Sequence, residues 1–243
     1  MSWTFPHLKL LGDFEVTHGG ARICLHAGAQ RLLAFLALQS DGVNRQMAAE
    51  RLWPDCPPCR AAANVRTALY QIRHTGMPMA IESLDHRLRL SPSTGVDLHS
   101  VREHAQSIVT GLDQLPVSAD SLTETLSAVL LPNWAEEWLV LERERWGHIR
   151  LHALESLAQQ FLDSGRYLPA LQAALAATSV DPIRETAHRI MMEVYVAEGN
   201  VACAIKCYKN YREFLEKELG AAPSSRMAML ARDLLRSDVR QRM

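Results

Sequence analysis

The chain has 243 residues, of which 48% are hydrophobic and 22% charged, so it can bury one large core or two ordinary ones. Its 26 Lys and Arg residues against 27 Asp and Glu residues give a net charge of −1, which excludes a uniformly basic nucleic-acid-binding coat but allows a local basic face. No apolar run approaches the roughly 20 residues that span a bilayer, and the first seven residues lack a signal-peptide pattern, so we expect a cytoplasmic protein without membrane contact.

The first fifty residues predict a small antiparallel sheet followed by two helices. Short apolar runs at 8–11, 14–17 and 22–25 are separated by Gly- and Asp-containing turn signals. Residues 28–39 place leucine and alanine on one helical face. A second helix is expected over 45–53, with the preceding Asn44 as its N-cap.

A loop, a third helix and a terminal hairpin follow. Residues 54–59 contain three prolines, which do not fit inside a helix, so we predict a loop there. A third helix is expected over 60–74, and two strands over 79–82 and 87–90. A sheet, three helices and a terminal hairpin form an α+β winged helix-turn-helix, which we place in residues 1–97.

The second half is predicted to be all-α and to contain an internal repeat. Small and apolar residues recur 34 positions apart between 153–171 and 187–205, and so do Gly165 and Gly199. This is the period of tetratricopeptide hairpins, which stack into curved binding surfaces. Further segments with helical periodicity would complete a tetratricopeptide-like helical-repeat domain across 98–243; they are residues 98–109, 122–131 and 226–239.

Three tryptophans lie near the start of this second half. Trp134, Trp138 and Trp146 could suggest an aromatic ligand cage. Their placement along the start of a helix favours packing instead, and we predict that they pack between the repeats.

The third predicted helix has the residue types that read DNA. Val65, Leu69 and Ile72 recur at helical spacing and are expected to face the core. The opposite side then presents polar and cationic side chains: Arg60, Asn64, Thr67, Tyr70, Gln71 and His74. Because amide side chains pair with adenine and a threonine methyl group contacts thymine, we assign base contacts to Asn64, Thr67 and Gln71. Phosphate contacts are assigned to the long cations Arg60, Arg66 and Arg73.

The predicted hairpin adds two cations. Arg87 and Arg89 alternate with Leu88 and Leu90, and the two-residue period of a strand places both arginines on one face. Paired arginines suit an adjacent minor groove or its phosphates. Between residues 60 and 90 five arginines outweigh two acidic residues, a local balance of +3.

A series of motifs occurs in the same order as in one known family. In the first part these are LLGDFEV at 10–16, GAQRLLAFLAL at 28–38, LWPD at 52–55, NVRTAL at 64–69, RLRL at 87–90 and VDL at 96–98. In the second part they are LPNWAEEW at 131–138, ERER at 142–145 and LGAAPS at 219–224. Together they resemble the Streptomyces antibiotic regulatory protein family, which has an OmpR/PhoB-type winged helix and a bacterial transcriptional activation domain.

The resemblance implies a bacterial, nucleoid-associated, sequence-specific DNA-binding activator. The resemblance also implies binding to direct repeats near promoters and contact with RNA polymerase. We therefore expect double-stranded DNA and polymerase as partners. The protomers would act as a homodimer or in tandem on the DNA. The sequence contains no receiver domain, ATPase domain or Gly-rich phosphate loop, which predicts a short, stand-alone member. Catalytic motifs are also absent, so we predict no enzymatic activity and no cofactor.

Two other hypotheses stand beside this one. The first is a helical-repeat interaction module whose winged helix no longer binds DNA. The second rests on the cysteines: Cys56 and Cys59 have CxxC spacing, and Cys203 and Cys207 lie four residues apart. Four thiolates could hold zinc or sense oxidation. The two pairs fall in different predicted domains, which favours a plain loop and two packed helix cysteines, and we predict no metal site.

Overall fold

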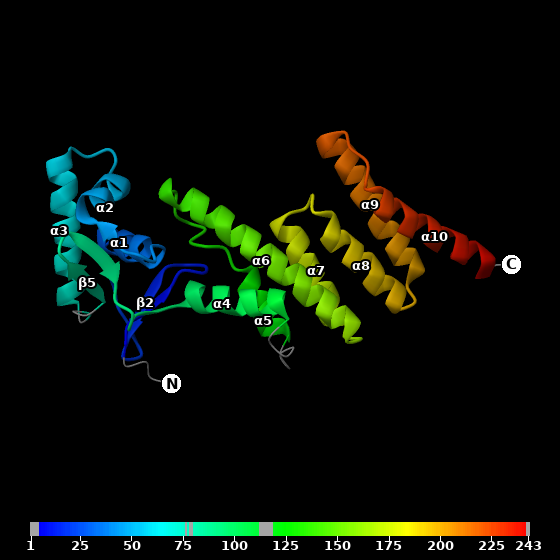
Figure 1. Cartoon of the computed structure of the whole chain (residues 1–243), viewed down its shortest axis with the longest axis horizontal. Helices are drawn as coiled ribbons and strands as arrows, with labels where there is room; N and C mark the ends of the chain where they lie inside the picture. The colour runs from blue at the N-terminus through cyan, green and yellow to red at the C-terminus, as the bar shows by residue number, and fades with distance from the viewer. Residues whose placement is uncertain (1–4, 76, 78–79, 112–118, 242–243) are drawn as a thin grey trace. The chain divides into compact units, whose positions relative to one another are not determined.

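A computed structural model describes residues 5–75, 77, 80–111 and 119–241. The predicted strand position Met79 lies outside the described residues. Contacts within the chain divide it into two compact units, each treated separately below (Figure 1). The first contains residues up to Val101 together with Val129–Arg145, and the second contains Arg102–Ala128 together with residues from Trp146 onward.

The first unit opens with the predicted antiparallel sheet, in shorter strands. The order is β3-β2-β1-β7, formed by β1 (His7–Lys9), β2 (Glu15–His18), β3 (Ala21–Arg22) and β7 (Gly95–Val96). Leu8 pairs with Val16 on one side and with Val96 on the other. All three side chains are buried, so one row across the sheet faces the core. The sequence pattern did not reveal β7, which runs parallel to β1.

Three helices and a second sheet complete the N-terminal part. The helices are α1 (Ala27–Ala37), α2 (Arg45–Leu52) and α3 (Pro58–His74), and the sheet has the order β4-β6-β5, with β4 (Val43–Asn44), β5 (Ile81–Leu84) and β6 (Arg87–Leu90). The predicted cap is confirmed, because the Asn44 side chain accepts the Gln46 N–H at 2.8 Å. The predicted loop was too long. Pro58 and Cys59 form the first turn of α3, where a proline costs nothing because no intrahelical partner exists for its missing N–H.

The segment Val129–Arg145 packs against the β1–β2 turn and α1. Leu130 forms an antiparallel bridge with Leu11, and the Gly12 N–H donates to the Val129 carbonyl at 2.8 Å. Trp134 lies 5.5 Å from Phe14, and Trp138 lies edge-on to Phe35 at 5.3 Å, both measured between ring centroids. The prediction that these two tryptophans pack between repeats was wrong, since they cover the first unit instead.

Two side chains hold this segment and the start of α4 in place. The Arg143 guanidinium donates to the backbone carbonyls of Leu130, Leu131 and Trp134. The Asp97 carboxylate accepts the N–H groups of Leu10, Leu11 and Leu98 at 2.8, 3.0 and 2.7 Å. Each of these charges therefore satisfies three backbone groups that no strand or helix would pair.

The second unit is helical, and none of the described helices is long and apolar enough to cross a membrane. The helices that form it, in whole or in part, are α4 (Asp97–Thr110), α5 (Ala119–Ser127), α6 (Trp138–Asp163), α7 (Tyr167–Val180), α8 (Glu185–Ala197), α9 (Val201–Leu219) and α10 (Ser225–Gln241). The helix predicted over 122–131 ends at Ser127. Beyond it, Leu130 lies in the bridge with Leu11.

The repeat found in the sequence appears as two equal turns. Gly165 and Gly199 adopt φ values of 73° and 79°, in the left-handed region that favours glycine. After each glycine the next N–H reaches back five residues, from Arg166 to the Phe161 carbonyl at 2.8 Å and from Asn200 to the Tyr195 carbonyl at 2.7 Å. The α6–α7 and α8–α9 connections are thus equivalent.

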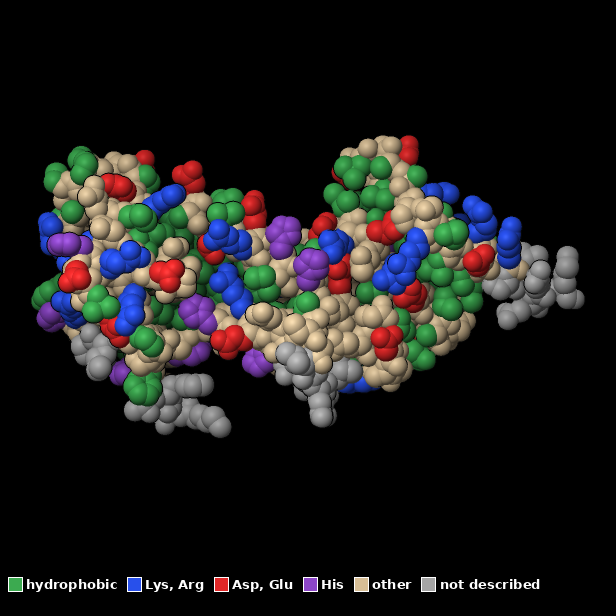
Figure 2. Space-filling model, in the orientation of Figure 1, with side chains coloured by type: hydrophobic (Ala, Val, Ile, Leu, Met, Phe, Trp, Pro, Cys, Tyr) green, Lys and Arg blue, Asp and Glu red, His purple; other side chains and the backbone are tan. Residues whose placement is uncertain are grey.

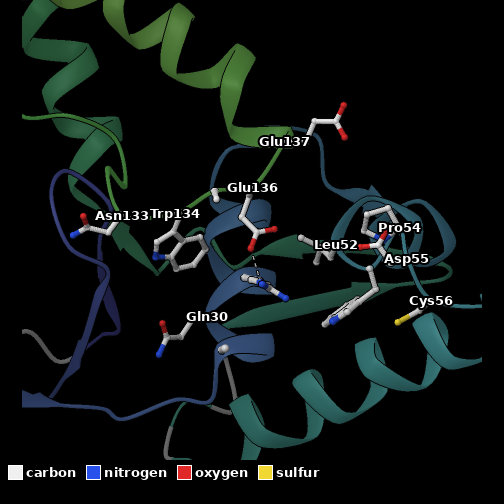
Figure 3. A pocket seen from close by; sticks show the side chains of 13 residues that line it. Gln30, Leu52, Pro54, Asp55, Cys56, Asn133, Trp134, Glu136 and Glu137 are labelled. Atoms are coloured by element: carbon white, nitrogen blue, oxygen red, sulfur yellow. Dashed lines mark ion pairs between the residues drawn. The ribbon is translucent and has the colours of Figure 1, made fainter.

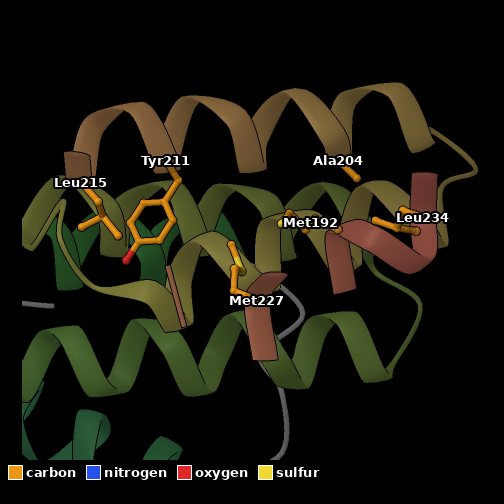
Figure 4. Close-up of a cluster of buried hydrophobic side chains, with 7 residues drawn as sticks. Met192, Ala204, Tyr211, Leu215, Met227 and Leu234 are labelled. Atoms are coloured by element: carbon orange, nitrogen blue, oxygen red, sulfur yellow. The ribbon is translucent and has the colours of Figure 1, made fainter. Parts of the chain in front are cut away.

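A compact apolar cluster joins the last three helices (Figure 4). Its buried members come from α8, α9 and α10; they are Met192, Ala204, Tyr211, Leu215, Met227, Ala231 and Leu234. Small residues at positions such as Ala204 and Ala231 allow the helix backbones to approach closely. This burial fixes α10 against α9, so α10 closes the end of the helical unit.

Candidate nucleic-acid interface

Helix α3 buries one side and exposes the other. Ala61, Val65, Ala68, Leu69 and Ile72 are buried, and α1 and α2 both pack against this side of the helix. The predicted core face is confirmed for Val65, Leu69 and Ile72. The remaining face is therefore available to a partner.

The middle of the exposed face is a polar and aromatic ridge. With 3.6 residues per turn, Thr67, Tyr70 and His74 lie opposite the buried side chains. Tyr70 is 61% exposed and stacks on His74, with ring centroids 3.9 Å apart. His74 Nδ1 donates to the Tyr70 carbonyl at 2.8 Å, and the Thr67 hydroxyl donates to the Ala63 carbonyl at 3.1 Å. These contacts pair the polar groups of the ridge with the helix backbone and stack its two rings on each other.

Asn64 and Gln71 lie at the edge of this ridge and not at its centre. Both are half-buried. The Asn64 amide is 4.0 Å from the Cys56 sulfur, so the loop before α3 shields it. The sequence pattern places them on the polar side correctly, but it does not distinguish edge from centre.

The helix arginines lie on both flanks of the ridge. Arg60 is on the flank of Asn64 and Gln71, whereas Arg66 and Arg73 occupy the opposite flank, as the helical period requires. All three are exposed. In Figure 2, Lys, Arg and His side chains, with a few acidic ones between them, line the edge of the first unit where α3 lies in Figure 1.

The two hairpin arginines differ in their partners. Leu88 is buried and both arginines are exposed, so the predicted alternation is present. Arg87 donates to the carbonyls of Asp41 and Gly42 at 3.1 and 2.9 Å. Arg89 forms a salt bridge with Glu82 on the neighbouring strand at 2.6 Å. Part of the local positive charge counted from the sequence is therefore neutralised.

One cation of this region was missed by the sequence analysis. Arg45, the first residue of α2, donates through its side chain to the Ser83 hydroxyl at 2.6 Å. Its backbone N–H donates to the His86 carbonyl at 3.0 Å. Arg45 thus ties α2 to the hairpin. Cross-strand and helix–turn contacts of this kind depend on tertiary pairing, so no local pattern predicted them.

The CxxC cysteines line two separate clefts of the first unit. Cys56 lines a cleft of about 620 Å³ between the loop after α2 and residues 133–137 (Figure 3). In the same cleft Arg31 forms a 2.6 Å salt bridge with Glu136. Cys59 lines a different cleft, between α2 and α3. Within the part of the chain that the structure describes, no group of three or more His, Cys, Asp or Glu side chains could hold a metal ion.

The fold and the site together define a mostly helical protein in two parts, in which a small α+β unit presents an arginine-flanked helix face. The bacterial transcriptional activator domain family matches residues 97–235, more than half of the chain. The chain therefore belongs to this family and, with the relatives below, to the Streptomyces antibiotic regulatory proteins.

Two relatives are regulatory proteins of Streptomyces. Regulatory protein AfsR of Streptomyces coelicolor is 27% identical over 243 residues, which cover 94% of this chain and 24% of AfsR. Regulatory protein DnrI of Streptomyces peucetius is 24% identical over 253 residues, covering 95% of this chain and 92% of DnrI. The chain thus spans about a quarter of the first relative and nearly all of the second.

A solved structure supports the fold. Mycobacterium tuberculosis EmbR, determined in complex with a low-affinity phosphopeptide, matches with a TM-score of 0.75 and 18% identity. The match covers 96% of this chain and 65% of the EmbR chain. At this identity the similarity establishes a common fold and nothing about the ligand.

Proposed function

We propose that the protein is a transcriptional activator that binds double-stranded DNA through a winged helix, with α3 in the major groove. The observation that carries this proposal is the α3 face: an exposed ridge of Thr67, Tyr70 and His74 with exposed arginines on both flanks. A helix in the major groove has a phosphate backbone on each side. Arginines on both flanks match that geometry, since one row can reach each strand.

The roles of the side chains follow from their places on the helix. Thr67 and Tyr70 at the centre would contact base edges first, whereas Asn64 and Gln71 would read bases on one side of the groove only. Arg60, Arg66, Arg73 and the hairpin's Arg87 would contact phosphates. The relatives' names support the regulatory role, because both are regulatory proteins.

The first test separates phosphate contacts from base contacts. Arg66→Ala and Arg73→Ala should weaken binding to all DNA sequences alike, and each should lower the log–log salt slope by about 0.9. Gln71→Ala and Asn64→Ala should each cost about 1–3 kcal/mol on the preferred site and relax its sequence preference. Fluorescence anisotropy with a selected site and a scrambled duplex measures both effects. Arg232→Ala, an exposed arginine of the second unit, is the matched control.

Equal affinity and slope for the arginine variants and the control would reject this docking of α3. An unchanged selected consensus for both amide variants would transfer base reading to other residues. Because the variants replace exposed or half-buried side chains, loss of folding does not confound either result.

We further propose that two protomers bind a direct repeat in tandem and contact RNA polymerase. One winged helix covers about one half-site, and head-to-tail protomers read direct repeats, whereas a two-fold dimer reads a palindrome. Cooperative occupancy is expected for repeats spaced by about one helical turn, on the order of 10–11 base pairs. Inserting five base pairs rotates one site by about half a turn, and retained cooperativity and activation on that template would contradict the tandem arrangement.

One observation favours the alternative of an interaction module without DNA binding. The Glu82–Arg89 salt bridge removes one of five cations from the candidate interface. If the purified protein showed no salt-dependent affinity for any duplex in a random-sequence selection, this alternative would replace the first proposal. The helical unit would then carry the function through its repeated hairpins.

A further inference from the structure

The helical unit contains a cleft that the DNA-binding proposal does not use. It has a volume of about 560 Å³ and lies among α7, α8 and α9. Aromatic and sulfur-containing side chains, including Met191, Tyr195 and Phe214, form much of its lining. Clefts of about 300–1,000 Å³ with an apolar lining and few polar groups are typical of small-molecule sites.

Two polar groups of the cleft wall are already paired within the protein. The Tyr211 hydroxyl donates to the Ile183 carbonyl at 2.8 Å, and His188 Nε2 donates to the Pro182 carbonyl at 3.0 Å. The two rings stack with their centroids 4.1 Å apart. Because backbone carbonyls hold both rings, the wall is preformed, and a ligand loses little affinity to ordering it.

Two titratable groups of the wall, His188 and Cys207, are uncharged at neutral pH. Burial lowers the pKa of the His188 imidazole, so its neutral form dominates there. Burial raises the pKa of the Cys207 thiol to about 11, so this thiol stays protonated. Glu185, whose charge acts on His188, is bound by the backbone N–H and hydroxyl of Ser224 and does not line the cleft.

Of the described residues that line the cleft, Lys206 alone is charged, and none is an aspartate or a glutamate. Among the described residues Lys206 takes part in no salt bridge with a carboxylate. A flat ligand can stack on the aromatic wall, and an anionic group at its edge can pair with the ammonium group. We propose that this cleft binds a small, planar, hydrophobic anion, namely a fused-ring aromatic carboxylate.

Calorimetry on the full chain with 2-naphthoate and its neutral amide tests the chemistry. We expect 2-naphthoate to bind, and the amide to bind about 1.4- to fivefold more weakly, because an exposed ion pair is worth about 0.2–1 kcal/mol. Lys206→Met should reduce naphthoate affinity by the same factor and leave amide binding unchanged. Lys209→Met, an exposed lysine on the same helix outside the cleft, should change neither.

Two measurements locate the ligand. Cys203→Trp should fill the mouth of the cleft and abolish binding, whereas Ala202→Trp, at the exposed neighbouring position outside the lining, should not. Bound naphthoate should also slow alkylation of exposed Cys203 but not of exposed Cys24.

The proposal is overturned if naphthoate does not bind to the parent protein. It is also overturned if the Lys206→Met and Cys203→Trp variants bind naphthoate as tightly as the parent does. Without ligand, slower alkylation of Cys203 at higher protein concentration would show that a second copy of the chain covers the cleft. That result would also overturn the proposal. None of these results depends on DNA binding, so this proposal and the proposed function can fail separately.

Discussion

Releasing Arg89 from its salt bridge should strengthen DNA binding. Glu82→Gln removes the carboxylate that lies 2.6 Å from the Arg89 guanidinium. The two side chains are 45% and 36% exposed. Because solvent screens such a pair, it stabilises the fold by less than about 1 kcal/mol, and the variant should remain folded.

The gain in DNA affinity comes from one additional phosphate contact. The local charge between residues 60 and 90 increases by one unit, and Arg89 becomes free to contact a phosphate. One added contact raises the log–log salt slope by about 0.9, which near 0.1 M salt corresponds to an increase of up to about eightfold in affinity. The increase should apply to specific and scrambled duplexes alike, since phosphate contacts do not report sequence.

Anisotropy titrations between about 50 and 200 mM salt measure both quantities. The double variant Glu82→Gln/Arg89→Ala should lose the gain, and Glu216→Gln, which removes an exposed charge from the second unit, should show none. An unchanged slope in Glu82→Gln, or a gain that survives in the double variant, would refute the assignment of the hairpin to the phosphate backbone.

Three further predictions concern stability. Asp97→Ala leaves three backbone N–H groups without their acceptor and should lower the free energy of unfolding by about 2–4 kcal/mol in urea titrations; Asp97→Asn should recover part of this, and no difference from the parent would contradict the role of this carboxylate. Burial lowers the pKa of His188, so as the pH falls the unfolded chain takes up this proton before the folded protein does. The free energy of unfolding should therefore fall as the pH drops below about 6.5 and level off below the pKa of the folded state. His188→Asn should flatten this pH dependence, and an equally steep profile in the variant would show that His188 is not its source. Gly199→Ala should lower the free energy of unfolding by about 1 kcal/mol, because Gly199 has a φ of 79°. Gly147→Ala, within α6 and with open space around its Cβ position, should raise it by up to about 1 kcal/mol. Thermal unfolding measures both, and equal effects would show that the turn at Gly199 does not require a glycine.

The local elements of the fold were largely predictable because their signals are local. The helical period of Val65, Leu69 and Ile72 predicted the buried side of α3, and the 34-residue spacing of Gly165 and Gly199 predicted two equivalent turns. The two-residue strands β4 and β7 were missed, since two residues carry no periodicity. The helix limit at Pro58 was misplaced, because a proline can terminate a helix or begin one.

What the sequence could not provide was the pairing of distant segments. Arg89 counted as a free cation until Glu82 was found beside it on the neighbouring strand. Trp134 and Trp138 gave an aromatic pattern without a partner, and their contacts with Phe14 and Phe35 span more than a hundred residues of chain. Asn64 looked equivalent to Thr67 on a helix projection, but the loop at Cys56 half-covers it. The roles in DNA binding stay predictions.

The segment that covers Phe14 and Phe35 has a consequence for how such a gene can be divided. Helices α4 and α6 each begin in one unit and end in the other, so the first unit is discontinuous along the chain. A recombination event near codon 97 would transmit the elements proposed to bind DNA without Val129–Arg145, and the recipient protein would inherit uncovered aromatic side chains. The second unit is discontinuous as well, since it joins Arg102–Ala128 to the helices from Trp146 onward, and α5 packs against α7. Selection should therefore favour inheritance of the coding sequence of both units as one block.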